Sequence, residues 1–117
     1  MIKLDNEKGS ICISTDVITW LAGDAATRCF GVKGMVGKAK ESGLYQLLRR
    51  ESMSKGVSAK FQEDGSVALE LHIAVDQGVN ISALAHSIMG EVSYKVNKAT
   101  GVPVSGVDVF VDAMLIG

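Results

Sequence analysis

The residue types that most often carry chemistry are few in this sequence, and Cys12 and His72 are the first pair to consider. Both fall on the solvent-facing side of predicted strands, where a thiol beside an imidazole could form a nucleophile pair or half of a zinc site. The sequence offers no third ligand and no residue to orient the histidine, because His86 lies on a predicted helix that covers the opposite face. We therefore interpret both as surface residues, and we expect neither a catalytic residue nor a bound metal.

A glycine-rich segment, residues 31–38, has some features of a phosphate-binding loop. The nucleotide-binding loop requires four residues between its first glycine and its Gly-Lys pair, and a Ser or Thr after the lysine. Here five residues separate Gly31 from Gly37, and Ala39 follows Lys38. Gly31 to Gly34 also has the GxxG spacing with which KH domains clamp RNA, but this pattern is frequent by chance. We therefore expect no cofactor at this segment.

Charge is distributed unevenly along the chain, whose formal net charge is −1. The segment from Arg28 to Lys60 holds eight Lys or Arg residues and two Glu residues, a local charge of +6, so the rest of the chain carries −7. Such a distribution favours a surface that attracts anions, or two surfaces that attract each other between copies. The basic residues that we expect to contact a partner are Lys33, Lys38, Lys40, Arg49 and Arg50.

The elements that position these residues are predicted from hydrophobic periodicity. Apolar residues at every second position predict a strand over residues 67–75, joined by an Asp-Gly turn to a strand over residues 57–61. The other predicted elements are strands over residues 9–13 and 107–111 and helices from Ser14 to Gly31 and from Asn80 to Thr100. The resulting order, β-α-β-β-α-β, is the split βαβ pattern. It predicts an α+β fold with a four-stranded antiparallel sheet and two helices packed on one face.

The sheet face that the helices leave open is the second predicted partner surface. Its predicted members are Cys12, Ser58, Lys60, Glu70, His72, Asp108 and Phe110. RNA-binding sheets of the RRM type require stacked aromatic residues and positive charge, whereas Phe110 is the only aromatic residue here and lies beside two carboxylates. We expect His72 and Phe110 to contact a protein, and we do not expect nucleic acid as a partner.

Length and composition favour a single domain over residues 1–117. Residues 1–8 are polar and are expected to be frayed, and residues 31–55 are expected to form an irregular connection because glycines interrupt them. No apolar run approaches the ~18 residues of a membrane span, and no signal-peptide pattern begins the chain. Two cysteines without the spacing of a disulfide framework favour a cytoplasmic location.

Several motifs resemble those of the alkaline-shock, envelope stress response family of Gram-positive bacteria. The motifs are Gly9-x-Ile11-x-Ile13-Ser14, Gly31-Val32-x-Gly34-Met35, Lys55-Gly56-Val57, Asp64-Gly65, Val75-x-x-Gly78-x-Asn80-Ile81 and Thr100-Gly101-Val102-x-Val104-x-x-Val107-x-Val109-x-Val111. They cover nearly the whole chain, which is similar to the short, stand-alone members of the family. Gln77 stands where the family commonly has an aromatic residue.

The resemblance implies a cytoplasmic, self-associating protein that reaches the membrane through a protein partner and supports envelope homeostasis. No catalytic residue is established for that family, which agrees with the lack of a convincing active site in the sequence. We therefore expect a non-enzymatic structural or adaptor protein of the cell-envelope stress response, present as a homo-oligomer. The alternatives are RNA or anionic-lipid binding through the basic 33–50 segment, and regulation of fatty-acid kinase or lipid metabolism, which rests on gene association alone.

Overall fold

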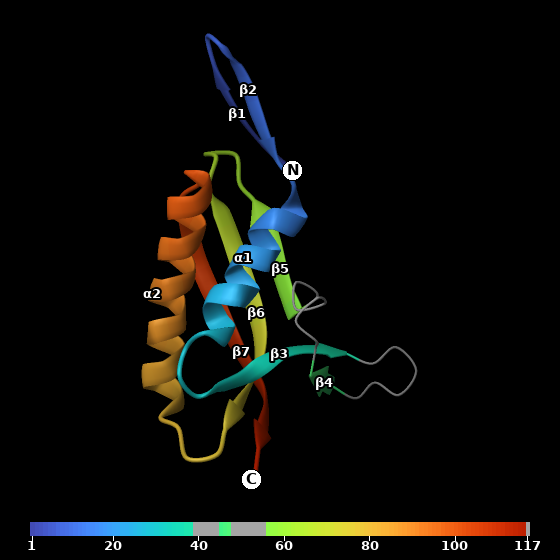
Figure 1. Ribbon diagram of the computed structural model, residues 1–117, viewed down its shortest axis with the longest axis vertical. Helices are drawn as coiled ribbons and strands as arrows, with labels where there is room; N and C mark the ends of the chain where they lie inside the picture. The colour runs from blue at the N-terminus through green and yellow to red at the C-terminus, as the bar shows by residue number, and fades with distance from the viewer. Residues whose placement is uncertain (39–44, 48–55, 117) are drawn as a thin grey trace.

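The computed structural model describes residues 1–38, 45–47 and 56–116 of the chain. In these residues two helices cover one curved sheet, and a separate two-stranded hairpin projects from one end of the molecule (Figure 1). The elements are β1 (Ile2–Asn6), β2 (Gly9–Ile13), α1 (Thr15–Thr27), β3 (Val32–Lys38), β4 (Tyr45–Leu47), β5 (Val57–Phe61), β6 (Val67–Asp76), α2 (Ile81–Thr100) and β7 (Val104–Leu115).

Strand β6 is the centre of the sheet, as its alternating sequence predicts. Its apolar residues at every second position, from Val67 to Val75, are no more than 2% exposed and face the helices. Strand β5 pairs antiparallel with the first half of β6, and β3 pairs antiparallel with the second half. Strand β7 runs along β6 for its full length, so it occupies the other edge of that strand.

The turn between β5 and β6 forms at the predicted Asp64-Gly65 pair. Gly65 has φ 87°, a left-handed conformation that side chains disfavour and glycine accepts. The carboxylate of Asp64 accepts hydrogen bonds from the Ser66 hydroxyl at 2.6 Å and from the Ser66 backbone N–H at 3.0 Å. These contacts hold the turn in one conformation and so fix the register in which β6 pairs with β5.

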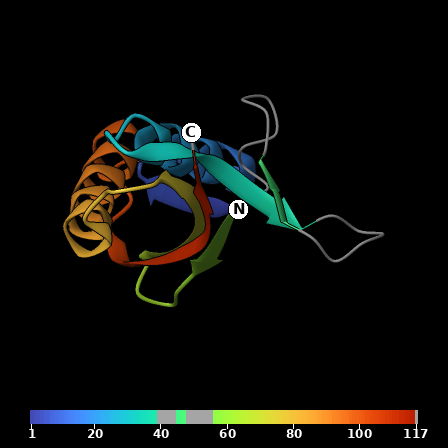
Figure 2. The ribbon, with the colours of Figure 1, turned by 90° about the horizontal axis from the view of Figure 1, so that it is seen from below.

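Both helices lie on one side of the sheet, which confirms the predicted α+β class (Figure 2). Helix α1 packs on α2, β3 and β5, and α2 packs on β7. The Asn80 side chain caps α2 by accepting from the Ala83 N–H at 3.0 Å, and Gly101 ends it at φ 77°, as predicted. Ser14 occupies the cap position of α1 without a side-chain cap hydrogen bond. Within the described residues, no helix combines the length and apolar character needed to cross a membrane.

The strand arrangement differs from the split βαβ prediction at β7, which pairs with β6 in parallel rather than antiparallel orientation. In the split pattern a third strand separates the two strands joined by the second helix, and the expected third strand was residues 9–13. That segment is not part of the sheet. Because residues 9–13 do not lie between them, β6 and β7 are direct neighbours. Together with α2 they form a simple βαβ unit, whose two strands are parallel.

Residues 1–13 form the projecting hairpin, whereas residues 1–8 were expected to be frayed. Strands β1 and β2 pair antiparallel, with Ile2 opposite Ile13 and Leu4 opposite Ile11. Ile2 is 8% exposed and belongs to the core, while Ile11, farther from the domain, is 57% exposed. Ile2 and Leu4 lie on one face of β1, and this explains why the segment pairs locally. The alternation is short, and the charged residues Lys3 and Asp5 make it difficult to recognise in the sequence.

Residues 31–55, expected to be irregular, include β3 and β4; the rest of the segment lies outside the described residues. Glycines interrupt the two-residue period of β3, and a bulge between Val32 and Gly34 restores the register with β6. Met35 is fully buried and Val36 is 3% exposed. Strand β3 therefore contributes to the core despite its glycine content.

Candidate interaction surfaces

The sheet face opposite the helices carries a row of polar and aromatic side chains from three strands. Strand pairing places Ser58 beside Glu70, Glu70 beside Asp108, and His72 beside Phe110. The structure thus brings together the predicted open-face residues of β5, β6 and β7. Cys12 is the exception, because it lies on the separate β1–β2 hairpin and cannot pair with His72 through the sheet.

His72 is fixed at the centre of this face by contacts to both of its ring nitrogens. Its Nδ1 lies 2.7 Å from Oδ2 of Asp112, and its Nε2 lies 3.1 Å from Oε1 of Glu70. The ring of Phe110 stacks on the imidazole with centroids 4.8 Å apart and planes inclined by 13°. Because Glu70 and His72 are on β6 whereas Phe110 and Asp112 are on β7, these contacts join the two strands.

The hydrogen-bonding capacity of the imidazole is used within this cluster. Ionised carboxylates only accept hydrogen bonds, and each ring nitrogen of His72 lies within hydrogen-bonding distance of one of them. These contacts hold the imidazole in one orientation on the open face.

Negative charge dominates the open face. The carboxylates of Glu70, Asp108 and Asp112 lie along β6 and β7, and Lys60 on β5 is exposed nearby. A shallow hollow of about 350 Å³ lies beside them, with Ser58, Lys60, Glu70 and Asp108 in its lining. Within the described ranges, no group of three or more His, Cys, Asp or Glu residues is arranged to hold a metal ion.

The predicted basic surface is described only in part. Lys33 on β3 is exposed, and its Nζ forms an ion pair with Oδ1 of Asp76 at 3.1 Å, so part of its charge is balanced within the chain. Lys38 is the last residue of β3. Lys40, Arg49 and Arg50 lie outside the described residues, and their role as a partner surface remains a prediction.

A second concave surface lies where the end of α1 meets the first half of α2. This groove has a volume of about 680 Å³, and Phe30, which is 98% exposed, stands at its rim. Its lining includes Ala25, Ala83 and Gly90, whose small side chains leave the space between the helices open.

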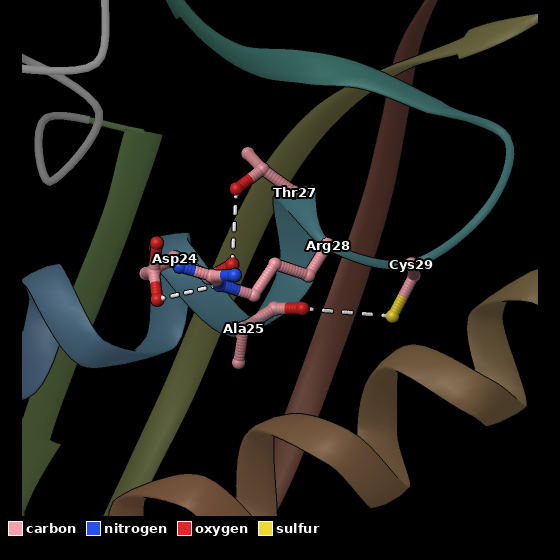
Figure 3. A network of polar contacts seen from close by, with 5 residues as sticks. All are labelled: Asp24, Ala25, Thr27, Arg28 and Cys29. Carbon is pink, nitrogen blue, oxygen red and sulfur yellow. Dashed lines mark hydrogen bonds and ion pairs between the residues drawn. The ribbon is translucent and has the colours of Figure 1, made fainter.

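The α1 side of the groove is held by local hydrogen bonds (Figure 3). The Arg28 Nε donates to the Asp24 carboxylate at 3.0 Å, and the Thr27 hydroxyl donates to the Asp24 carbonyl at 3.0 Å. The Cys29 thiol donates to the Ala25 carbonyl at 3.6 Å. The thiol contact gives the Ala25 carbonyl a partner in the last turn, where helix carbonyls lack the usual ones, and the Asp24 carbonyl also accepts from the Arg28 backbone N–H at 3.3 Å.

The Cys29 thiol is poorly suited to nucleophilic chemistry. Burial raises its pKa, and the negative charge of Glu91 on α2 raises it further. A raised pKa lowers the fraction of thiolate, which is the reactive form. Cys29 therefore lacks the electropositive surroundings that activate a thiol, and it forms no disulfide with Cys12.

Two residues of these surfaces were not predicted from the sequence. Asp112 continues the alternation of Asp108 and Phe110, and extending that pattern by two residues would have placed it on the open face beside His72. Phe30 carries no comparable signal, and only the fold shows its exposure.

Proteins of known sequence resemble this chain over most of its length. It is 36% identical over 116 residues to the protein YloU of Bacillus subtilis (strain 168), covering 98% of this chain and 96% of that protein. It is 32% identical over 111 residues to Spy1614 of Streptococcus pyogenes serotype M6, covering 94% and 91%.

Solved structures share the fold at lower sequence identity. The copper form of the MamM CTD has a TM-score of 0.52 and 18% identity, and the match covers 88% of this chain and 89% of that chain. A second MamM CTD structure has a TM-score of 0.52 and 17% identity, covering 86% and 99%.

Because the model of the alkaline shock protein family, described as having a cell envelope-related function, matches residues 3–116, this chain belongs to that family, as its sequence motifs predicted.

Proposed function

We propose that this protein is a non-enzymatic, self-associating structural or adaptor protein that serves the cell envelope through contact with other proteins. Membership of the alkaline shock protein family, which is described as having a cell envelope-related function, supports a role at the cell envelope. The observation that carries the proposal is the His72 cluster, in which a rigid aromatic and acidic surface is exposed on a sheet face while its hydrogen-bonding groups are engaged with one another.

The cluster has the properties of a preformed contact surface. Stacked rings supply a large contact area with little side-chain entropy to lose, and the two carboxylates hold the imidazole in one orientation. Phe110 is 43% exposed, so much of its ring is accessible to a partner. Both ring nitrogens of His72 already contact carboxylates of the same cluster, which supports a contact role for this surface.

Exposed apolar side chains support self-association or the binding of a protein partner. Those of Phe30, Phe110, Met114 and Ile116 are between 43% and 98% exposed, and they lie on the groove rim or on β7 and its end. Where exposed apolar side chains lie together, they typically mark a surface that is covered in the working assembly. Association with the membrane would take place through a protein partner.

The MamM structures support the fold but no metal function for this chain. One of them is a copper form, which is a statement about MamM. In the present chain His72 bonds both nitrogens to carboxylates, so a metal would have to displace Glu70 or Asp112 from the ring.

The proposal is tested in cells that naturally make the protein, by replacing the natural gene with one that encodes the double variant His72→Ala, Phe110→Ala. We expect growth under envelope stress to fall to the level of a deletion strain, at unchanged protein abundance. Lys95→Ala, an exposed change on α2 away from the open face, is the matched control and should behave as wild type. Full stress tolerance in the double variant, or in the deletion strain itself, would contradict the proposal.

A further inference from the structure

We infer that the free edge of β7 pairs antiparallel with the β7 of a second copy, so that the sheets of the two copies join into one. This inference rests on the self-association proposed above and names the surface responsible for it. Among the described residues, β7 is twelve residues long and pairs with β6 alone. A strand edge of this length presents a row of unpaired backbone groups that can bind another strand.

The other described edge strands are protected in ways that β7 is not. Strand β5 has five residues and carries the exposed Lys60, and β4 has three residues. Short length and lysine are devices that discourage edge-to-edge pairing. Strand β7 contains no Lys or Arg, so neither device protects it.

The central part of β7 is regular enough to act as a template. Bulges occur near Ser105 and Asp112, and between them residues 106–111 keep a constant register with residues 68–73 of β6. This segment, Gly-Val-Asp-Val-Phe-Val, is rich in residues that favour strands and has one charge, at Asp108. The bulges limit the pairing to about this length, which closes a pair rather than a long ribbon.

Incomplete burial on the helix-facing side of β7 shows where the missing neighbour would lie. Leu71 and Ile73 of β6 are fully buried, but their partners in register, Val109 and Val111, are only half-buried. Val107, on the same face of β7, is buried, so the partial exposure is confined to Val109 and Val111. At these positions β6 has strands on both sides, whereas β7 has a strand on one. A strand added to the outer edge would cover these valines.

A second copy of β7 fits this edge because its sequence is compatible with itself. With Val109 opposite Val109 across a two-fold axis, Val107 faces Val111 of the other copy and Asp108 faces Phe110. The valines then extend one apolar face, and no two carboxylates are directly opposed. Centring the pair on Phe110 instead would set Asp108 against Asp112, a like-charge pair that is disfavoured.

The first experiment is hydrogen exchange on the unmodified protein, above and below the dissociation constant measured by sedimentation. We expect the outward-facing backbone amides of residues 106–111, which belong to alternate residues, to exchange at least about tenfold more slowly in the associated state, because these groups gain partners. The amides of residues 57–61, on the opposite edge, are the internal control and should not change.

The second experiment tests the register by disulfide cross-linking in a Cys12→Ser, Cys29→Ala background. Val109→Cys places two thiols directly across the axis, within reach of a disulfide after a small adjustment, so mild oxidation should give covalent dimers. Phe110→Cys is the matched control: its two thiols would be diagonal neighbours about 7–8 Å apart, and it should give little dimer.

The outcomes separate this inference from the proposed function. Association with slowed exchange in residues 106–111 and dimers of Val109→Cys supports the edge pairing. Association without added protection there, or cross-linking that favours Phe110→Cys, overturns the proposed pairing while leaving self-association intact. A protein that stays monomeric at every concentration overturns both.

Discussion

His72 shows how one side chain can link two strands and shape a surface at once. Its bond to Asp112 on β7 crosses the strand pair, its bond to Glu70 stays within β6, and its stacking on Phe110 adds a second link between the two strands. The sequence predicted that His72 and Phe110 share a face, because alternation fixes which side of a strand each residue occupies. It did not predict the hydrogen bonds, because these depend on how β7 is set against β6.

Replacing His72 by alanine is expected to destabilise the fold by about 1–2 kcal/mol. Two hydrogen bonds to charged groups and a ring stack are lost, but the side chain is 31% exposed, so water recovers part of the loss. The measurement is urea unfolding followed by circular dichroism. Ser58→Ala, on the same face and without a comparable network, should change stability by less than about 0.5 kcal/mol. Equal effects of the two changes would show that the cluster contributes nothing specific.

Asp64 gives a prediction about pH. The Ser66 hydroxyl and then its backbone N–H donate to the carboxylate and hold the pKa of Asp64 below its ordinary value. The folded pKa is thus lower than the unfolded pKa, so the stabilisation is present above the unfolded value of about 3.9 and is lost as pH falls through the folded value. Wild type should therefore exceed Asp64→Asn in urea midpoint near neutral pH, and the difference should shrink at about pH 2. A difference that persists unchanged in acid would assign the effect to turn geometry rather than to charge.

At the scale of elements, the sequence predicted what local periodicity controls and missed what pairing partners control. Strand β6 and helix α2 formed where their two-residue and helical periods indicated, with the Asn80 cap and the Gly101 stop. The parallel placement of β7 and the exclusion of residues 9–13 from the sheet were not predicted, because the same alternation suits either partner. Strand β3 was missed because its glycines conceal a strand that a bulge keeps in register.

The β1–β2 hairpin is expected to open independently of the domain. Two strands alone are marginal in water, and among the described residues this pair hydrogen-bonds to no third strand. Only Ile2 at its base is buried in the core. Amides of residues 3–12 should exchange at least about a hundredfold faster than those of β6, as measured by nuclear magnetic resonance. Protection equal to that of β6 in the monomer would mean that the hairpin is held by contacts outside the described residues.

At the scale of the whole molecule, two kinds of surface are separated. The sheet face carries the carboxylates of Glu70, Asp108 and Asp112, whereas the sequence concentrates a charge of +6 between Arg28 and Lys60. This charge separation is evident from the order of residues alone. The position of the acidic residues on one face depends on strand alternation, and their closeness to the exposed edge of β7 became apparent only from the parallel pairing of β6 and β7.

The charge separation predicts that Arg49→Glu, Arg50→Glu weakens self-association or capture of a protein partner about tenfold or more without unfolding the domain. Reversing two charges in the basic segment removes attraction to acidic surfaces. Lys95→Glu with Lys98→Glu makes the same change in net charge on α2 and is the control for overall charge. Sedimentation and pull-down measure the effect, and unchanged binding would exclude this segment as a protein-binding surface.

Gel-shift and liposome-flotation assays at two salt concentrations test the alternative, in which the basic segment binds RNA or anionic lipid, because a ligand bound through its phosphates would be released steeply by salt. The variant would then lose phosphate binding while its self-association and its capture of a protein partner stayed unchanged.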